Sequence, residues 1–174
     1  MKSALVGTVL AWIVIGAIAT RGVARVGSDQ GYSPAQPIAF SHRIHAGDAK
    51  VPCLYCHYAA MRSPHAGIPP ASVCMNCHTL LTRQTTEIQK LREAVLQARP
   101  ISWVKVHNLP DFVHFDHSQH VRAQVACQSC HGTVEAMERV RQEMPLAMGW
   151  CLECHQTRGV GEHGARTDCV RCHY

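Results

Sequence analysis

Aromatic residues are scarce in this chain of 174 residues, where they make up 6% of the sequence. Large aromatic side chains provide much of the buried surface of an ordinary domain, so the polypeptide alone predicts a small hydrophobic core. The sequence also lacks the alternating patterns of β-strands, apart from a weak one at Val104–Val106. These shortages argue against a sheet-based fold and against a core built from the polypeptide alone.

No cysteine lies outside one repeated pattern. The ten cysteines form five Cys-x-x-Cys-His motifs, which we number 1 to 5 in chain order. Two thiols at this spacing can add to the two vinyl groups of one haem, and the histidine that follows can bind the iron. The cysteines are Cys53 and Cys56, Cys74 and Cys77, Cys127 and Cys130, Cys151 and Cys154, and Cys169 and Cys172; the histidines are His57, His78, His131, His155 and His173. The sequence therefore predicts five covalently bound haems c.

Chance, zinc and disulfides explain these motifs less well. A shuffled chain of this composition would contain on the order of 0.04 such pentapeptides. Zinc ribbons use paired Cys-x-x-Cys, but a four-thiolate site does not need a histidine after each pair. A disulfide across two residues is strained and is typical of redox motifs rather than of structural bridges. Haem is the favoured interpretation, with zinc and a redox disulfide as the alternatives.

Bound haems would supply the apolar mass that the polypeptide lacks. We therefore expect a mostly irregular and α-helical multihaem cytochrome c, with short helices around a haem core and folding that depends on haem attachment. The formal net charge of the chain is +5. Because the propionates of the haems would offset this charge, we predict no nucleic-acid partner.

Eight of the thirteen histidines lie outside the motifs, more than five irons need as sixth ligands. His42 and His45 occur in the pattern Phe-x-His-x-x-His ahead of motif 1, and His117 and His120 occur in the same pattern ahead of motif 3. Two histidines three residues apart on a helical turn can reach two neighbouring irons. Together with His107, these four are the predicted distal ligands. An iron held by two imidazoles has no open position, so it would transfer electrons and bind no substrate.

Other side chains compete for the distal role. His65, His114 and His163 are weaker candidates, for which a propionate hydrogen bond or a place at the surface is the alternative. A methionine could replace one imidazole and raise the potential of that haem. Met137, Met144 and Met148 are placed for this, with packing on a haem face as the alternative.

The repeated histidine pattern divides the chain into two di-haem units and a fifth haem at the tail. Between the units, apolar residues fall on one face of a predicted helix over Thr85–Arg99, which Pro100 terminates. We interpret this helix as a connector that packs on a haem face, with a docking helix for a partner as the alternative. Short helices are also predicted around the motifs and over Val134–Gln142.

The amino-terminal segment Ser3–Thr20 contains 18 residues without a charge. As a helix it would be roughly 27 Å long, which is close to the thickness of a membrane core. Ala17-Ile18-Ala19 resembles a signal-peptidase site, so a cleavable secretory signal is the alternative. We expect an uncleaved transmembrane anchor over residues 1–25 and a linker over residues 26–37.

Flanking charges do not fix the orientation of this anchor, because Lys2 precedes it while Arg21 and Arg25 follow it. Haem attachment takes place on the exported side of a bacterial membrane. We therefore expect a single-pass protein of the bacterial inner membrane with a periplasmic pentahaem domain. That domain is predicted over residues 38–174, as a di-haem unit (38–82), a connecting helix (83–100) and a tri-haem unit (101–174).

Several segments resemble known families. Phe-x-His-x-x-His ahead of a haem motif resembles the class III multihaem cytochromes. Ala66-Gly67-Ile68-Pro69-Pro70 before motif 2, the segment from Trp103 to Val113, and Pro145-Leu146-Ala147-Met148-Gly149-Trp150 before Cys151 are more specific. Together with the anchor, they resemble the pentahaem cytochrome c subunit of bacterial alternative complex III, over about Ile38 to Cys154.

That resemblance implies an electron-transfer subunit of a quinol-oxidising respiratory or photosynthetic membrane complex. Such a subunit would relay electrons from an iron–sulfur subunit to a monohaem cytochrome c or a soluble periplasmic acceptor, beside integral quinol-binding subunits. The resemblance implies distal ligation by His42, His45, His107, His117 and His120, whereas His114 stands where an aromatic residue is usual. No segment resembles a quinone pocket, so quinol oxidation is assigned to the partners.

A multihaem enzyme that acts on nitrite or hydroxylamine is the alternative. Such an enzyme needs an iron with an open position, often a lysine as proximal ligand, and more protein to build a substrate pocket. Every motif here ends in histidine, and the chain is short. The sequence therefore predicts no catalytic residue and no enzyme activity of the subunit itself.

Overall fold

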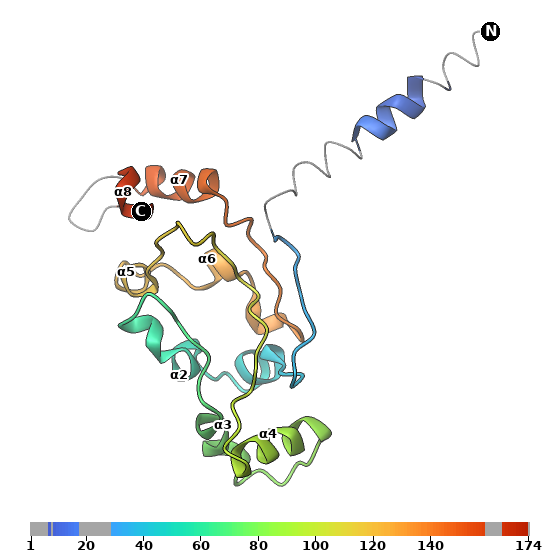
Figure 1. Ribbon diagram of the computed structural model, residues 1–174, viewed down its shortest axis with the longest axis vertical. Coiled ribbons are helices and arrows are strands. Elements are labelled where there is room, and N and C mark those ends of the chain that lie inside the picture. The colour runs from blue at the N-terminus through green and yellow to red at the C-terminus, as the bar shows by residue number, and fades with distance from the viewer. Residues whose placement is uncertain (1–6, 8, 18–28, 159–164, 174) are drawn as a thin grey trace.

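The computed structural model describes residues 7, 9–17, 29–158 and 165–173. Within these ranges the protein consists of short helices joined by extended and turn segments, without a β-strand (Figure 1). In chain order the elements of the body are the π-helix η1 (Arg43–Asp48), α2 (Cys53–Cys56), the 3-10 helix η2 (Tyr58–Met61), α3 (Ala71–His78), α4 (Thr86–Leu96), α5 (His117–Arg122), α6 (Gln128–His131), the 3-10 helix η3 (Val134–Ala136), α7 (Met148–Thr157) and α8 (Cys169–Cys172). The prediction of a mostly helical and irregular fold is confirmed.

The predicted short helices around the haem motifs are confirmed. Motifs 1 to 5 overlap α2, α3, α6, α7 and α8, respectively. Cys-x-x-Cys-His is a local pattern, and one helical turn brings its two thiols to the same side of the chain. Each motif therefore forms its own attachment site from adjacent residues.

The connecting helix α4 begins where the sequence predicts. Thr85 is its N-cap, with Oγ1 accepting a hydrogen bond from the Ile88 N–H at 3.3 Å. The helix ends at Leu96, before the predicted end at Arg99, because the chain turns with Ala98 at a positive φ of 48°. Arg92 donates to the His78 carbonyl at 3.0 Å, so α4 lies against the end of motif 2.

Two secondary-structure predictions are wrong. Val104–Val106 forms no strand, because the Gln36 side-chain amide takes up both the N–H and the carbonyl of Val104, each at 2.9 Å. The predicted helix over Val134–Gln142 is limited to η3. Beyond η3 the chain is extended and pairs with the amino-terminal part of the body, where the Gln142 N–H donates to the Tyr32 carbonyl at 3.0 Å.

The segment predicted as a linker over residues 26–37 is described from Asp29 onwards. There it lies along residues 140–143. The Gly31 N–H donates to the Gln142 carbonyl at 2.7 Å, and the Ser33 hydroxyl donates to the Val140 carbonyl at 3.1 Å. Gln142 is the most deeply buried side chain described, with 1% of its surface exposed.

The two segments predicted as di-haem units contact each other reciprocally. η1, from the first unit, packs on η3 from the second, and α5, from the second unit, packs on η2 from the first. The Arg43 N–H donates to the Met137 carbonyl at 2.9 Å, and the His117 N–H donates to the Pro64 carbonyl at 3.2 Å. Each histidine-bearing turn therefore rests on the chain that follows the first motif of the other unit.

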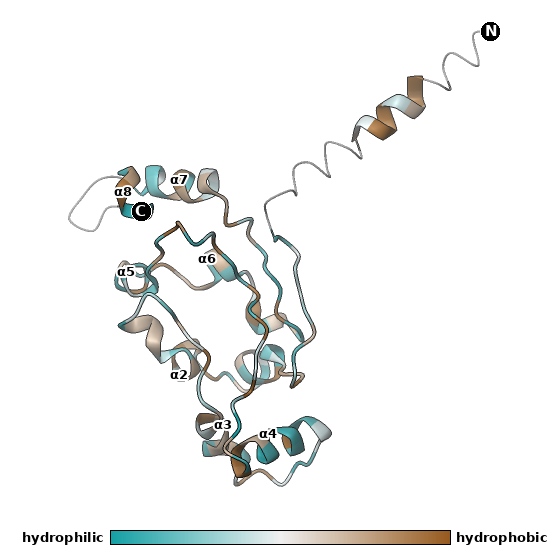
Figure 2. Cartoon of the chain, viewed as in Figure 1, coloured by the Kyte–Doolittle hydropathy of each residue, from teal (hydrophilic) through white to brown (hydrophobic). Residues whose placement is uncertain are grey.

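The polypeptide core is small. Seven of the described residues are buried, namely Ser41, Ala60, Leu91, Val106, Ser118, Met137 and Gln142. Over the body, hydrophobic and hydrophilic residues are interspersed rather than sorted into an inner and an outer layer (Figure 2). So few buried side chains offset little of the conformational entropy lost in folding, as expected of a body that needs additional apolar mass.

Within the predicted membrane segment Ser3–Thr20, the structure describes Gly7 and residues 9–17. The other residues of this segment lie outside the described ranges. These described residues are helical, lie apart from the body and are mostly hydrophobic (Figures 1 and 2). Their large apolar side chains are exposed, with Trp12 at 72%. In the described parts of the chain, no helix has both the length and the apolar character needed to cross a membrane.

Candidate haem-binding sites

The five motifs follow one another in space in an order that differs from their order in the chain. Motifs 1 and 2 are joined by a hydrogen bond of 3.1 Å from the Asn76 side chain to the Tyr55 hydroxyl. Motifs 1 and 3 meet where Cys53 and Gln128 line one shallow pocket. In Figure 1 the motif helices run from α3 at the bottom through α2 and α6 to α7 at the top, with α8 beside α7. The path through the molecule is therefore motif 2, 1, 3, 4 and 5.

The ten thiols, all unpaired, lie along this path. Burial raises the pKa of five of them, and a thiol of an adjacent motif on the path raises it further. The pairs are Cys56 with Cys77, Cys74 with Cys56, Cys127 with Cys53, Cys130 with Cys154, and Cys151 with Cys172. Attachment points of successive motifs on the path are thus close neighbours.

Three motif histidines face a histidine of the Phe-x-His-x-x-His pattern. The ring centroids are 6.0 Å apart for His45 and His78, 6.3 Å for His117 and His131, and 6.2 Å for His120 and His155. An imidazole nitrogen lies roughly 2 Å from a metal that it binds, so two imidazoles on opposite sides of one metal have centroids about 6 Å apart. The three pairs therefore have the separation that axial ligation of an iron requires.

His42 lies close to His57 of motif 1. Burial, together with the nearby His57 and His45, lowers the pKa of His42 to about 4. Its Nδ1 is buried without a hydrogen-bond partner among the described residues, as is Nδ1 of His78. A buried imidazole nitrogen without a hydrogen-bond partner costs stability.

Most of the remaining candidate ligands are fixed through Nδ1. This atom contacts the Ser41 carbonyl in His45, Gly67 in His57, Pro64 in His117, Asp116 in His120, Arg166 in His155 and Phe112 in His173, at 2.6 to 3.4 Å. A carbonyl only accepts, so Nδ1 carries the hydrogen and Nε2 keeps its lone pair. This tautomer directs Nε2 towards a metal, as the histidine ligands of metal sites generally do.

The two phenylalanines of the repeated pattern have a role that sequence reasoning did not assign. Phe40 stacks on His45 at 4.3 Å and meets His42 edge-on at 4.9 Å. Phe115 repeats this geometry, at 4.6 Å from His120 and 4.8 Å from His117. Each ring thus holds a pair of histidines at a fixed mutual angle. The signal was present in the repeat, because in both copies the phenylalanine stands two positions before the first histidine and five before the second.

His107 occupies a place that no sequence pattern indicated. Its Nε2 lies 3.2 Å from Nδ1 of His131, and the ring centroids are 4.5 Å apart at 84°. Burial lowers the pKa of the His107 imidazole. Burial and, after it, the neighbouring His107 contribute most to lowering the pKa of His131 to about 4. The structure therefore brings His107 against the proximal side of motif 3 rather than opposite the histidine of another motif.

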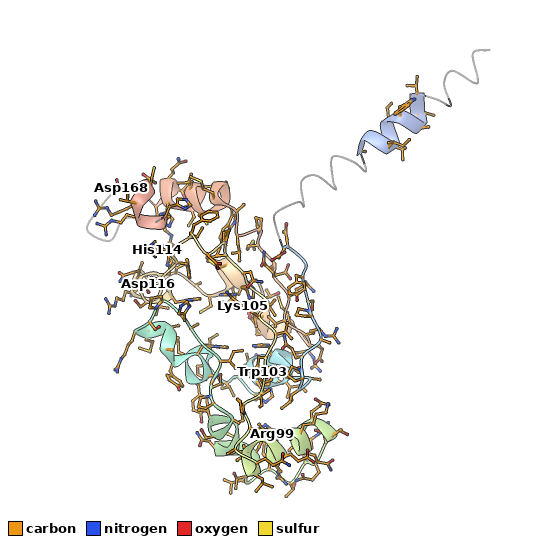
Figure 3. All side chains as sticks on the ribbon, in the orientation of Figure 1. Arg99, Trp103, Lys105, His114, Asp116 and Asp168 are labelled. Atoms are coloured by element: carbon orange, nitrogen blue, oxygen red, sulfur yellow. The ribbon has the colours of Figure 1, made fainter. Side chains whose placement is uncertain are left out.

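The weaker candidates are dispersed. His65 is exposed, and His163 lies outside the described residues. The His114 N–H donates to the Cys172 carbonyl at 2.8 Å, which places this residue, labelled in Figure 3 near the start of α5, beside motif 5. Met137 is buried at 5% exposure, Met144 is half-buried, and Met148 is exposed at the start of α7. His173 stacks on Phe112 at 5.8 Å.

The donor set fits covalent haem. Each motif presents two thiols and a following histidine, and motifs 2, 3 and 4 also meet a second imidazole at a distance suited to an iron. In the described parts of the chain, no group of three or more His, Cys, Asp or Glu side chains could hold a metal ion by itself.

Comparison with known proteins agrees with this geometry. Residues 113–174 match the family model described as "Cytochrome c7 and related cytochrome c". The chain is also similar to the protein named "Menaquinone reductase, multiheme cytochrome c subunit" from Nitratidesulfovibrio vulgaris strain Hildenborough, with 33% identity over 160 residues. That similarity covers 79% of this chain and 76% of the relative. Cytochromes of this type bind their haems covalently and transfer electrons. The chain belongs to the family of multihaem cytochrome c subunits.

Proposed function

We propose that this chain holds five haems c and relays electrons between partners within a membrane complex, without substrate chemistry of its own. The observation that supports this most directly is the set of imidazole pairs at 6.0 to 6.3 Å. Each haem, when bound, supplies one-electron exchange between ferric and ferrous iron. The polypeptide's part is to attach, orient and separate these groups.

The residues divide this work. The ten cysteines attach the haems, and His57, His78, His131, His155 and His173 are the proximal ligands. His42, His45, His117 and His120 are the proposed distal ligands for motifs 1, 2, 3 and 4, respectively. Burial lowers the pKa of His42. The carbonyl contacts at Nδ1 fix the ring orientation of His45, His117 and His120. At motifs 2, 3 and 4 an imidazole on each side of a bound iron would leave no place for a substrate, which favours a relay over a nitrite- or hydroxylamine-converting enzyme.

The order of the motifs in space suggests the route of the electrons. Motif 2, beside α4, and motif 5, at the carboxyl-terminal end, are the two ends of the path 2, 1, 3, 4, 5. Because the two histidines of one turn serve adjacent motifs, neighbouring haems would be coupled through a rigid piece of chain. We therefore expect electrons to enter at one end and leave at the other.

The complex that we favour is alternative complex III, in which this subunit would receive electrons from an iron–sulfur subunit and pass them to a monohaem cytochrome c or a soluble acceptor. The sequence segments around motifs 2, 3 and 4 support this assignment. A second candidate is the reverse direction, towards quinone, because the relative's name is that of a menaquinone reductase subunit. Extraction with mild detergent, identification of the copurified proteins, and mixing of the complex with reduced or oxidised menaquinone analogues would distinguish the two.

We also propose that the chain is anchored in the bacterial inner membrane by its amino-terminal segment, with the haem domain in the periplasm. The exposed apolar side chains of residues 9–17 and the uncharged stretch Ser3–Thr20 support this. Replacing Met1–Arg21 with a cleavable export signal should release a haem-loaded soluble protein. That protein should accept electrons from artificial donors but couple poorly to the quinone pool, because tethering raises the local concentration of the partner. Unchanged membrane association would contradict the anchor.

The haem count can be tested directly. The mass of the mature protein should exceed that of the polypeptide by five haems, and acid–acetone should not extract them. A smaller gain would contradict the count. The reduced protein should bind little carbon monoxide, since six-coordinate haems resist it; binding at one full haem equivalent would favour an enzyme with an open iron.

A further inference from the structure

His131 differs from the other motif histidines in what its Nδ1 contacts. In His57, His155 and His173 this atom contacts a backbone carbonyl, and in His78 it has no partner among the described residues. In His131 it contacts another imidazole, Nε2 of His107, at 3.2 Å. Among the residues that the structure describes, motif 3 is therefore the one motif whose proximal histidine has a side-chain partner at Nδ1.

The geometry does not allow an iron between these two rings. Their centroids are 4.5 Å apart and the rings are nearly perpendicular, at 84°, whereas axial ligands of one metal need about 6 Å. The opposite partner of His131 is His117, at 6.3 Å with the two rings within 7° of parallel. His131 thus has one nitrogen available to a metal and the other engaged with His107.

The direction of this hydrogen bond follows from the chemistry of haem attachment. If Nε2 of His131 binds the iron, the ring hydrogen of His131 is on Nδ1, so His131 donates and His107 accepts through Nε2. The buried neighbour Val106, at 7% exposure, fixes the backbone beside His107. We infer that His107 is a positioning residue which accepts a hydrogen bond from the proximal histidine of motif 3 and thereby lowers the reduction potential of that haem.

The effect on potential has a physical cause. A neutral imidazole nitrogen is a better acceptor than an amide carbonyl, so the N–H of His131 is more strongly polarised than that of His57 or His155. Polarisation makes His131 a stronger electron donor to its metal, and such outer ligand contacts are known to raise ligand basicity. Stronger donation stabilises ferric iron. Partial burial of both rings reduces competition from water and strengthens the bond.

This inference rests on the proposed haem at motif 3 and departs from the sequence-based expectation that His107 is a distal ligand. It leaves the sixth ligand of motif 5 to one of the other candidates, among them His114 and the three methionines.

The test uses the full-length, haem-loaded protein with His107→Leu, which removes the acceptor, and His107→Gln, which keeps an acceptor oxygen. Asn108→Leu, at the exposed neighbouring position, is the matched control. The haem content of each protein is measured by mass, its spin state by electron paramagnetic resonance, and its midpoint potentials by optical redox titration.

We expect His107→Leu to keep every haem low-spin and to raise a single midpoint potential. One neutral hydrogen bond is worth about 1.4 kcal/mol or less, so the reduction equilibrium of that haem should change by about twofold to tenfold, ~18–59 mV for one electron. His107→Gln should raise it less, and Asn108→Leu should leave all potentials unchanged.

Three outcomes would overturn the inference. A new high-spin, carbon monoxide-binding haem in His107→Leu would make His107 a distal ligand. Unchanged potentials would deny it any tuning role, and loss of haem from both His107 variants would make it essential for maturation instead. A wild-type protein without haem at motif 3 would instead refute the proposed function, so the two failures are distinguishable.

Discussion

Replacing His120 by alanine should open one iron and loosen one junction between motifs. His120 projects from α5 opposite His155 of motif 4, at a ring distance of 6.2 Å. Its Nδ1 donates to the Asp116 carbonyl at 2.8 Å, and its ring stacks on Phe115 at 4.6 Å. The hydrogen bond and the ring contact each contribute about 0.5–1.5 kcal/mol. The free energy of unfolding should therefore fall by about 1–3 kcal/mol, in addition to the lost metal bond.

The spectroscopic result should be confined to a single haem. Reduced His120→Ala should bind carbon monoxide at one haem equivalent, while the other haems stay low-spin, because His45, His117 and the motif histidines are untouched. Urea unfolding followed by circular dichroism gives the stability change. Arg122→Ala, an exposed change on the same helix, is the control and should alter neither property.

A fully low-spin His120→Ala protein with unchanged potentials would refute the reasoning. It would mean that the 6.2 Å separation from His155 is incidental and that another side chain supplies the sixth ligand of motif 4. An open iron at motif 3 instead would show that His117 and His120 have exchanged partners.

Three further predictions follow from other described residues. Asp116→Ala removes the N-cap of α5, and Thr85→Ala removes that of α4, so each should lower the free energy of unfolding by about 1 kcal/mol. Only Asp116→Ala should increase carbon monoxide binding, because α5 bears two proposed iron ligands. Burial holds the pKa of His42 at about 4, below its value of 6.5 when unfolded. As the pH falls, the unfolded chain therefore protonates at His42 before the folded protein does, and the free energy of unfolding in urea should fall from pH 6.5 towards pH 4. A rise of the free energy of unfolding over this window would contradict the burial of His42 as a neutral imidazole. Gly47→Ala would drive a Cβ into a backbone carbonyl of η3 and should cost about 1–3 kcal/mol, whereas Gly149→Ala, with open space at its Cβ, should be tolerated in the same unfolding assay.

Sequence reasoning succeeded where a few adjacent residues decide the structure. The helices at the haem motifs, the start of the connecting helix at Thr85 and the helical spacing of His117 and His120 depend on contacts within one or two turns. The repeated Phe-x-His-x-x-His pattern predicted that each turn would serve two motifs, and the ring distances to His78, His131 and His155 agree with this. The roles of all these residues as iron ligands stay predictions.

Sequence reasoning failed where distant segments compete with local preference. The predicted helix beyond Ala136 is lost because Gln142 pairs with Tyr32, more than a hundred positions away in the chain. The contact of His107 with His131 and the order of the motifs in space are of the same kind. Neither periodicity nor spacing records which segments meet, so only the three-dimensional structure could reveal them.

The reciprocal packing of η1 on η3 and of α5 on η2 has a consequence for the symmetry of the molecule. Equivalent pieces of the two di-haem units exchange equivalent contacts, and Cys53 lies beside its counterpart Cys127. This is the arrangement that an approximate twofold axis between the units produces, as in a homodimer whose two subunits have become one chain. Each unit therefore completes the junction of the other, so residues 38–82 without residues 101–174 would leave both η1 and η2 without their partners.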